Sequence, residues 1–126
     1  MTVDILCAEH DSKSCEMLKT ELKDYTLTFT NSGSKAAALT VRNNYDAIVM
    51  NVDLLEMSGY DAAILIKTYK PEIPIIGMNN LSPEDSIKIK RVSLDPFDII
   101  LRGSKKIKSL LRKKLEHYLE TQKKPL

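Results

Sequence analysis

The chain has 126 residues, of which 43% are hydrophobic and 29% are charged. This length and balance fit one globular domain with its own apolar core and require no second domain. Two cysteines, Cys7 and Cys15, are too few for a disulfide framework, and no apolar run approaches the roughly 20 residues of a membrane helix. We therefore expect a reduced, cytoplasmic protein without a signal peptide or a membrane anchor.

The net charge of +2 is unevenly distributed along the chain. Residues 1–101 carry 10 basic and 15 acidic side chains, whereas residues 102–126 carry 9 and 2, so that segment has a charge of +7. A basic segment indicates either a nucleic-acid partner or a solvated helix face, because cations are also favoured in the C-terminal half of a helix. We favour the solvated helix face.

Short apolar runs alternate five times with helical patterns, which is typical of βα units and a mostly parallel sheet with helices on both faces. Three of these runs are almost wholly apolar, as expected of strands buried on both sides. The predicted strands are Val3 to Ala8, Thr26 to Thr30, Ala47 to Met50, Ile75 to Met78 and Ile99 to Leu101.

Serines mark the predicted helix starts, because a serine hydroxyl accepts a hydrogen bond from a free N–H of the first turn. Ser58 with Asp61 also has the spacing of a reciprocal capping box. The expected N-caps are Ser12, Ser34, Ser58, Ser82 and Ser104. The apolar spacing from Ile107 to Leu119 predicts a last helix with one stripe on the sheet. We expect residues 1–120 to form the domain and residues 121–126 to be a frayed tail or the start of a linker.

The segment from Asp46 to Asp61, D-A-I-V-M-N-V-D-L-L-E-M-S-G-Y-D, resembles the third strand and following loop of response-regulator receiver domains. This resemblance implies the flavodoxin-like (βα)5 fold, with a five-stranded parallel sheet and helices on both faces, and a role in two-component signalling. Asn51 stands where the family has its phosphorylated aspartate. Leu55 replaces the family's proline, which predicts a looser turn after the third strand.

The other site positions of the family have changed as well. Glu9 and His10 stand where receivers have paired acids that hold a divalent metal. Asn79 stands at the Ser or Thr position, and Arg102 stands at the lysine position. Because a neutral amide is a poor nucleophile and an imidazole is a poor ligand for magnesium, we expect neither aspartyl phosphorylation nor magnesium binding. Ile99 replaces the aromatic switch residue, so the conformational relay should be lost too.

Two readings of the remaining acids differ in their chemistry. Glu9, His10 and Asp53 are candidate ligands for zinc or manganese, since they combine two carboxylates with an imidazole. The alternative, which we favour, is a polar cluster in which Arg102 neutralises both acids and no metal or cofactor is bound. Asp53 is a poor substitute acceptor, because its side chain should lean away from the in-line position.

These features together predict an atypical receiver domain that acts without phosphorylation as a protein-interaction or dimerisation module. The chain has no glycine-rich phosphate loop, nucleophile elbow or His/Cys metal spacing, so we do not expect an enzyme. The expected partners are another protein, an output domain, or a second copy bound through helix four, strand five and helix five. The candidate interface cations are Lys88, Lys90, Arg91, Lys105, Lys106 and Lys108.

Two other functions remain open at this stage. A phosphorylation-competent switch that uses the residual acids would respond to magnesium. A regulator that binds nucleic acid through the basic last helix would show a steep dependence on salt. The second is disfavoured for this domain alone, because Tyr118 is the only aromatic residue from Arg102 to Lys124 on which a base could stack.

Overall fold

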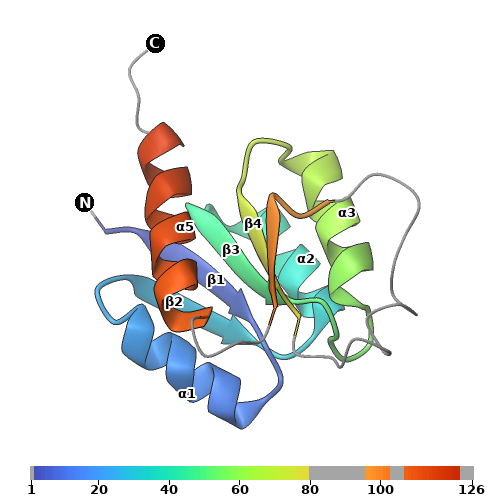
Figure 1. Cartoon of the computed structure of the whole chain (residues 1–126). Helices are drawn as coiled ribbons and strands as arrows, with labels where there is room; N and C mark the ends of the chain where they lie inside the picture. Colours follow the sequence, from blue (N-terminus) through green and yellow to red (C-terminus); the bar gives the residue numbers. More distant parts are fainter. Residues whose placement is uncertain (1, 80–95, 103–106, 123–126) are drawn as a thin grey trace.

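The computed structural model describes residues 2–79, 96–102 and 107–122, and these residues form an α/β fold (Figure 1). Five strands lie in the order β2-β1-β3-β4-β5, and every pairing between neighbours is parallel. The predicted fold class is confirmed, and each predicted strand end lies within one residue of the observed end. The strands are β1 (Asp4–Ala8), β2 (Thr26–Thr30), β3 (Ala47–Asn51), β4 (Ile75–Asn79) and β5 (Ile99–Arg102).

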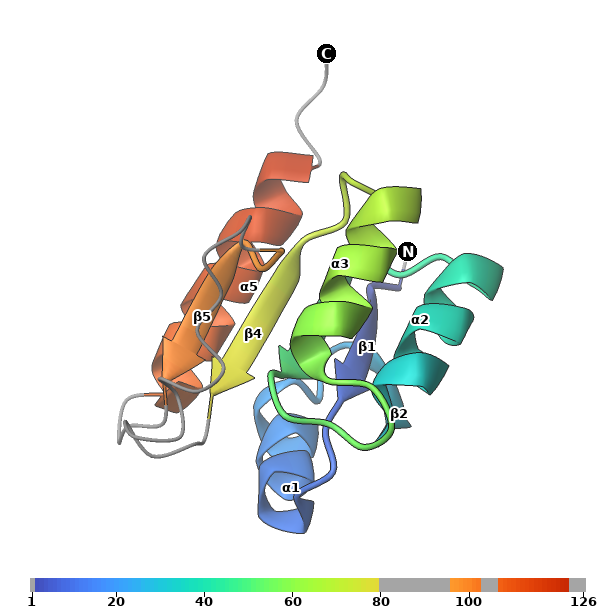
Figure 2. The same cartoon turned by 90° about the vertical axis from the view of Figure 1, so that its right-hand side faces the viewer.

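Helices cover both faces of the sheet, α1 with α5 on one side and α2 with α3 on the other (Figures 1 and 2). Along β1, Ile5 and Cys7 belong to the core beneath α1 and α5, while Leu6 and Ala8 belong to the core beneath α2 and α3. This burial on both faces explains why a central parallel strand is a continuous apolar run. The helices are α1 (Ser12–Glu21), α2 (Gly33–Arg42), α3 (Gly59–Tyr69) and α5 (Ile107–Gln122).

In the described ranges no helix has both the length and the apolar character needed to cross a membrane. Helix α5 continues to Gln122, two residues beyond the domain end expected from the sequence. The helix predicted from Pro83 to Leu94 lies outside the described residues.

Helix α1 has a different N-cap from the one predicted, because Asp11 rather than Ser12 occupies this position. The Asp11 carboxylate accepts hydrogen bonds from the backbone N–H and the hydroxyl of Ser14, both at 3.0 Å. These two bonds hold the pKa of Asp11 below its usual range. A charged acceptor at the positive end of a helix is favoured over a neutral hydroxyl, which explains why Asp11 is the cap.

Helix α2 is also capped earlier than predicted, by Ser32 rather than Ser34. The Ser32 hydroxyl accepts from the Lys35 N–H at 3.2 Å, and it also hydrogen-bonds the Ser34 hydroxyl at 2.9 Å. The prediction for α3 is confirmed, since the Ser58 hydroxyl accepts from the third residue of the helix at 3.1 Å. The two remaining predicted caps, Ser82 and Ser104, lie outside the described residues.

The loop between β3 and α3 is anchored to the loop between β2 and α2. The Leu55 N–H donates to the Asn31 carbonyl at 3.3 Å, and the Leu55 carbonyl accepts from the Gly33 N–H at 3.1 Å. Glu56 adopts a left-handed conformation, with φ of 65°. Backbone hydrogen bonds to a neighbouring loop therefore hold this turn, and the prediction that Leu55 makes it looser than a proline would stays a prediction.

Gly59 lets α3 start directly against the end of β3. Its N–H donates to the Val52 carbonyl at 3.0 Å, and a Cβ at this position would overlap the backbone carbonyl of Asn51. We expect Gly59→Ala to lower the free energy of unfolding by about 3 kcal/mol, because backbone atoms cannot move aside easily. Urea denaturation measures the change.

Gly77→Ala is the matched control. Its Cβ would lie 3.0 Å from the ring of Phe97, a side chain that can shift, so the loss should be smaller. Equal losses for the two variants would show that the close approach of α3 to β3 is not the constraint we infer.

Candidate functional site

Polar residues gather at the carboxyl edge of the sheet, where a ligand site is expected in this architecture. Glu9 follows β1, Asn51 ends β3 and Asn79 ends β4. These three side chains are 3%, 4% and 7% exposed, respectively. Arg102 ends β5 and pairs in register with Asn79. The structure thus brings the positions singled out from the sequence to the ends of four neighbouring strands.

A hydrogen bond between Asn51 and Glu9 connects β3 to β1. Asn51 Nδ2 donates to Glu9 Oε2 at 2.8 Å, and the backbone N–H groups of His10 and Asp11 donate to the same oxygen at 2.9 and 3.1 Å. The other end of the amide, Asn51 Oδ1, accepts from the backbone N–H of Asp53 at 2.9 Å. Because each end has a partner of the matching type, the orientation of the amide is fixed.

The side-chain amide of Asn51 supplies what the buried Glu9 carboxylate needs. A buried carboxylate is costly unless hydrogen-bond donors replace the water that it has lost. Here Glu9 Oε2 accepts three hydrogen bonds. An aspartate at position 51 would face Glu9 with a second carboxylate instead. The neutral amide therefore adds a donor beside the buried carboxylate without adding a second negative charge.

The predicted metal ligands do not form a ligand set. His10 and Asp53 are exposed, and no three His, Cys, Asp or Glu side chains within the described ranges are grouped to hold a metal. Glu9 Oε1 is buried and has no hydrogen-bond partner among the described residues. One carboxylate oxygen beside an amide N–H does not match the octahedral oxygen shell that magnesium requires. The described residues of this edge therefore do not fit magnesium.

Several predicted residues lie partly or wholly outside the described parts of the chain. The backbones of Arg102 and Ile99 belong to β5, but their side chains are not described, so the pairing of Arg102 with Glu9 and the loss of the switch at Ile99 stay predictions. Of the candidate interface cations, Lys108 is exposed on α5. The others, Lys88, Lys90, Arg91, Lys105 and Lys106, lie outside the described residues.

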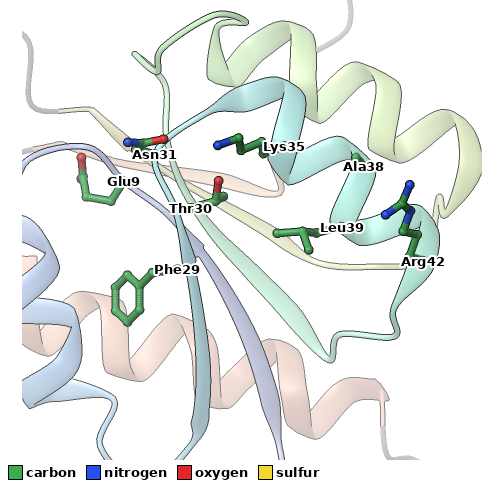
Figure 3. A pocket seen from close by; sticks show the side chains of 8 residues that line it. All are labelled: Glu9, Phe29, Thr30, Asn31, Lys35, Ala38, Leu39 and Arg42. Carbon is green, nitrogen blue, oxygen red and sulfur yellow. The ribbon is translucent and has the colours of Figure 1, made fainter.

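The sequence analysis missed a groove beside the carboxyl edge, between β2 and α2 (Figure 3). We call it the β2–α2 groove. Its volume is about 590 Å³, and Glu9 lines it together with two cations of α2, Lys35 and Arg42. Their spacing of seven residues, which places both on one side of a helix, was the available signal. The lining residues are Glu9, Phe29, Thr30, Asn31, Lys35, Ala38, Leu39 and Arg42.

Both cysteines are thiols without a disulfide partner, as the sequence indicated. Burial raises the pKa of Cys7 to about 12, with a further contribution from the nearby Cys15. Burial also raises the pKa of Cys15, and the charge of Glu9 adds to this effect. Both thiols are therefore protonated at neutral pH, which makes them poor nucleophiles and supports their interpretation as packing residues.

The model of the response regulator receiver domain family matches residues 5–116 of this chain. Transcriptional regulatory protein ZraR of Klebsiella oxytoca is 29% identical over 86 residues, which are 67% of this chain and 19% of that protein. The chain thus spans about a fifth of the length of that relative.

Solved receiver domains have the same fold at low sequence identity. The receiver domain of a signal transduction histidine kinase from Syntrophus aciditrophicus superimposes with a TM-score of 0.81 and 23% identity, over 99% of this chain and 96% of that one. The receiver domain of a sensor histidine kinase from Pseudomonas aeruginosa, solved with magnesium in its active-site cleft, gives a TM-score of 0.78 and 21% identity over 95% and 99%.

We expect Asn51→Asp to lower the free energy of unfolding by about 3 kcal/mol at pH 7, because it replaces a donor to Glu9 with a second buried carboxylate. The loss should shrink at pH 4, where one carboxyl of the pair binds a proton and can donate again. Urea denaturation at both pH values measures the effect. Asn51→Ala, which removes the donor without adding charge, should lose stability with a weaker dependence on pH. An Asn51→Asp variant as stable as the parent at pH 7 would contradict this account.

The raised pKa of Cys7 predicts a loss of stability in alkali. The folded state holds the thiol proton more tightly than the unfolded state, whose pKa is near 9.0, so this contribution is complete below pH 9 and is lost as the pH rises toward 12. The difference in unfolding free energy between the parent and Cys7→Ala should therefore shrink over this range. A difference that does not change with pH would contradict the assignment.

Proposed function

This chain belongs to the response regulator receiver domain family, and we propose that it is a degenerate receiver that binds partners without being phosphorylated. Receiver domains of two-component systems pass signals to other proteins or to output domains. The observation that carries the proposal is the hydrogen bond from Asn51 to Glu9. Formation of an acyl phosphate needs a carboxylate nucleophile, whereas the Asn51 amide is neutral and is hydrogen-bonded at both ends.

The surroundings of the amide support the same conclusion. The Pseudomonas aeruginosa receiver holds magnesium in its active-site cleft. In this chain the Asn51 N–H group points at Glu9, and His10 and Asp53 are exposed rather than gathered around a common centre. Phosphoryl transfer depends on a cation to neutralise developing charge, so a site that does not fit magnesium is poorly suited to this reaction.

The contacts of the last helix support a protein partner over nucleic acid. Arg112 of α5 donates to Glu116 at 2.9 Å, to Asp24 at 2.8 Å and to the Glu21 carbonyl at 2.7 Å. These bonds raise the pKa of Arg112 and join α5 to the end of α1 and the turn that follows it. One cation of the basic segment is therefore occupied within the fold and is not available for phosphates.

A dimer through β5 and α5 is a second form of the same proposal. On α5, Leu110 is 38% exposed, and Lys114, four residues on and therefore on the same side of the helix, is partly exposed. An apolar side chain beside a cation suits a protein contact, because the exposed ion pairs alone would contribute little. The expected partner of this surface is a second copy or an output domain.

Treatment with acetyl phosphate and magnesium tests the function directly. We expect no mass gain of one phosphoryl group in intact-mass spectrometry, because position 51 carries no nucleophile. A receiver domain that retains its acceptor aspartate serves as the positive control under the same conditions. A mass gain in this chain that disappears in Asp53→Asn would identify Asp53 as the acceptor and overturn the proposal.

A further inference from the structure

The outer edge of β2 is open for hydrogen bonding. Strand β2 is the end strand of the described sheet. The Thr26 N–H donates to the Val3 carbonyl, and the Thr30 carbonyl accepts from the Glu9 N–H, both at 2.9 Å. Since the direction of backbone groups alternates along a strand, the N–H and C=O groups of Leu27 and Phe29 face away from β1. These groups are a template for one further strand.

The β2–α2 groove runs beside this edge and has a row of side chains from α2. Figure 3 shows Lys35, Ala38, Leu39 and Arg42 in sequence along the helix, with the two cations at the ends of the row. Seven residues of helix separate these cations by about 10 Å along the axis. A compact anion cannot bind both, but about three residues of extended chain cover this length. The spacing therefore suits an extended ligand.

The charged side chains beside β2 indicate which charge such a ligand would carry. Lys35 and Arg42 are exposed, and neither forms an ion pair with another described residue. On the other face of β2, the ammonium group of Lys19 lies 5.5 Å from the centre of the Phe29 ring and also forms an exposed ion pair with Glu16 at 3.5 Å, so this face adds little net charge. Glu9, the one acid of the groove, is 3% exposed, so the solvent-facing charges are positive.

These cations disfavour a second copy of this chain as the occupant. Two β2 strands paired across a twofold axis would bring the cations of both copies together, and like charges placed opposite each other are destabilising. A strand with carboxylates would instead be attracted, and its backbone would complete the hydrogen bonds of β2. Charge complementarity thus points to an acidic extended segment of a different protein.

We propose that an acidic segment of a partner protein adds to the outer edge of β2 as a sixth strand, with carboxylates in the β2–α2 groove that contact Lys35 and Arg42. This inference rests on the proposed function only in treating the domain as a protein-binding module. Phosphorylation at the carboxyl edge would leave it intact, so the acetyl phosphate experiment and the binding experiment can fail separately.

Amide NMR with a synthetic peptide tests the proposal. The probe is a nine-residue peptide of alternating Glu and Val, which in a strand places all its carboxylates on one side. We expect saturable shifts at Leu27 and Phe29, slower hydrogen exchange of both amides, and weaker binding at higher salt. Lys35→Glu combined with Arg42→Glu should weaken binding roughly tenfold. Lys108→Glu with Lys113→Glu, the same charge change on exposed sites of α5, should not.

Three results would overturn the proposal. The first is equal binding of a peptide with Lys in place of Glu, or no binding of either. The second is shifts at Lys35 and Arg42 without protection of the Leu27 and Phe29 amides, which would indicate an anion site rather than strand addition. The third is protection of these amides that rises with protein concentration in the absence of peptide, which would identify a second copy as the occupant.

Discussion

The hydrogen bond from Asn51 Nδ2 to Glu9 Oε2 determines the character of the carboxyl edge of the sheet. A carboxylate that is 3% exposed needs donors, and Glu9 obtains them from this amide and from the two backbone N–H groups that follow it. The amide is positioned in turn by the Asp53 N–H, in the loop that Gly59 allows to turn tightly against β3. Among the described residues, the carboxylate thus receives its hydrogen bonds from neutral groups.

The fold does not depend on the residues that would carry out phosphorylation, the reaction that we propose this domain has lost. The two cores on either side of the sheet are built from apolar residues of the strands and helices, and neither depends on the polar edge. Replacing an acceptor carboxylate by an amide can therefore leave the architecture unchanged while removing a nucleophile. What remains available for signalling is surface, and one such surface is the open edge of β2 beside Lys35 and Arg42, which form no ion pair with another described residue.

Much of the fold could be predicted because its signals are local. Apolar runs of four to six residues determined the strands, and parallel topology then placed Glu9, Asn51 and Asn79 at one edge. The caps were less predictable where several acceptors are neighbours, as with Asp11 and Ser12. The hydrogen bond from Asn51 to Glu9 could not be derived either, since several donors stand at the ends of neighbouring strands and only the geometry shows that the Asn51 amide reaches this carboxylate. The β2–α2 groove depends on how far α2 lies from the sheet edge, which no local pattern encodes.

The most direct test of the central claim is a two-dimensional amide NMR spectrum recorded with and without magnesium and beryllofluoride, a mimic of the aspartyl phosphate. One experiment then reports on the hydrogen bond of the Asn51 side chain, on metal binding and on any conformational change that spreads from the site. The account predicts unchanged resonances at Glu9, Asn51 and Asn79, because the Asn51 amide neither binds the mimic nor gives way to a cation. Saturable shifts that begin at these residues and spread across the sheet would contradict it and establish a working receiver switch.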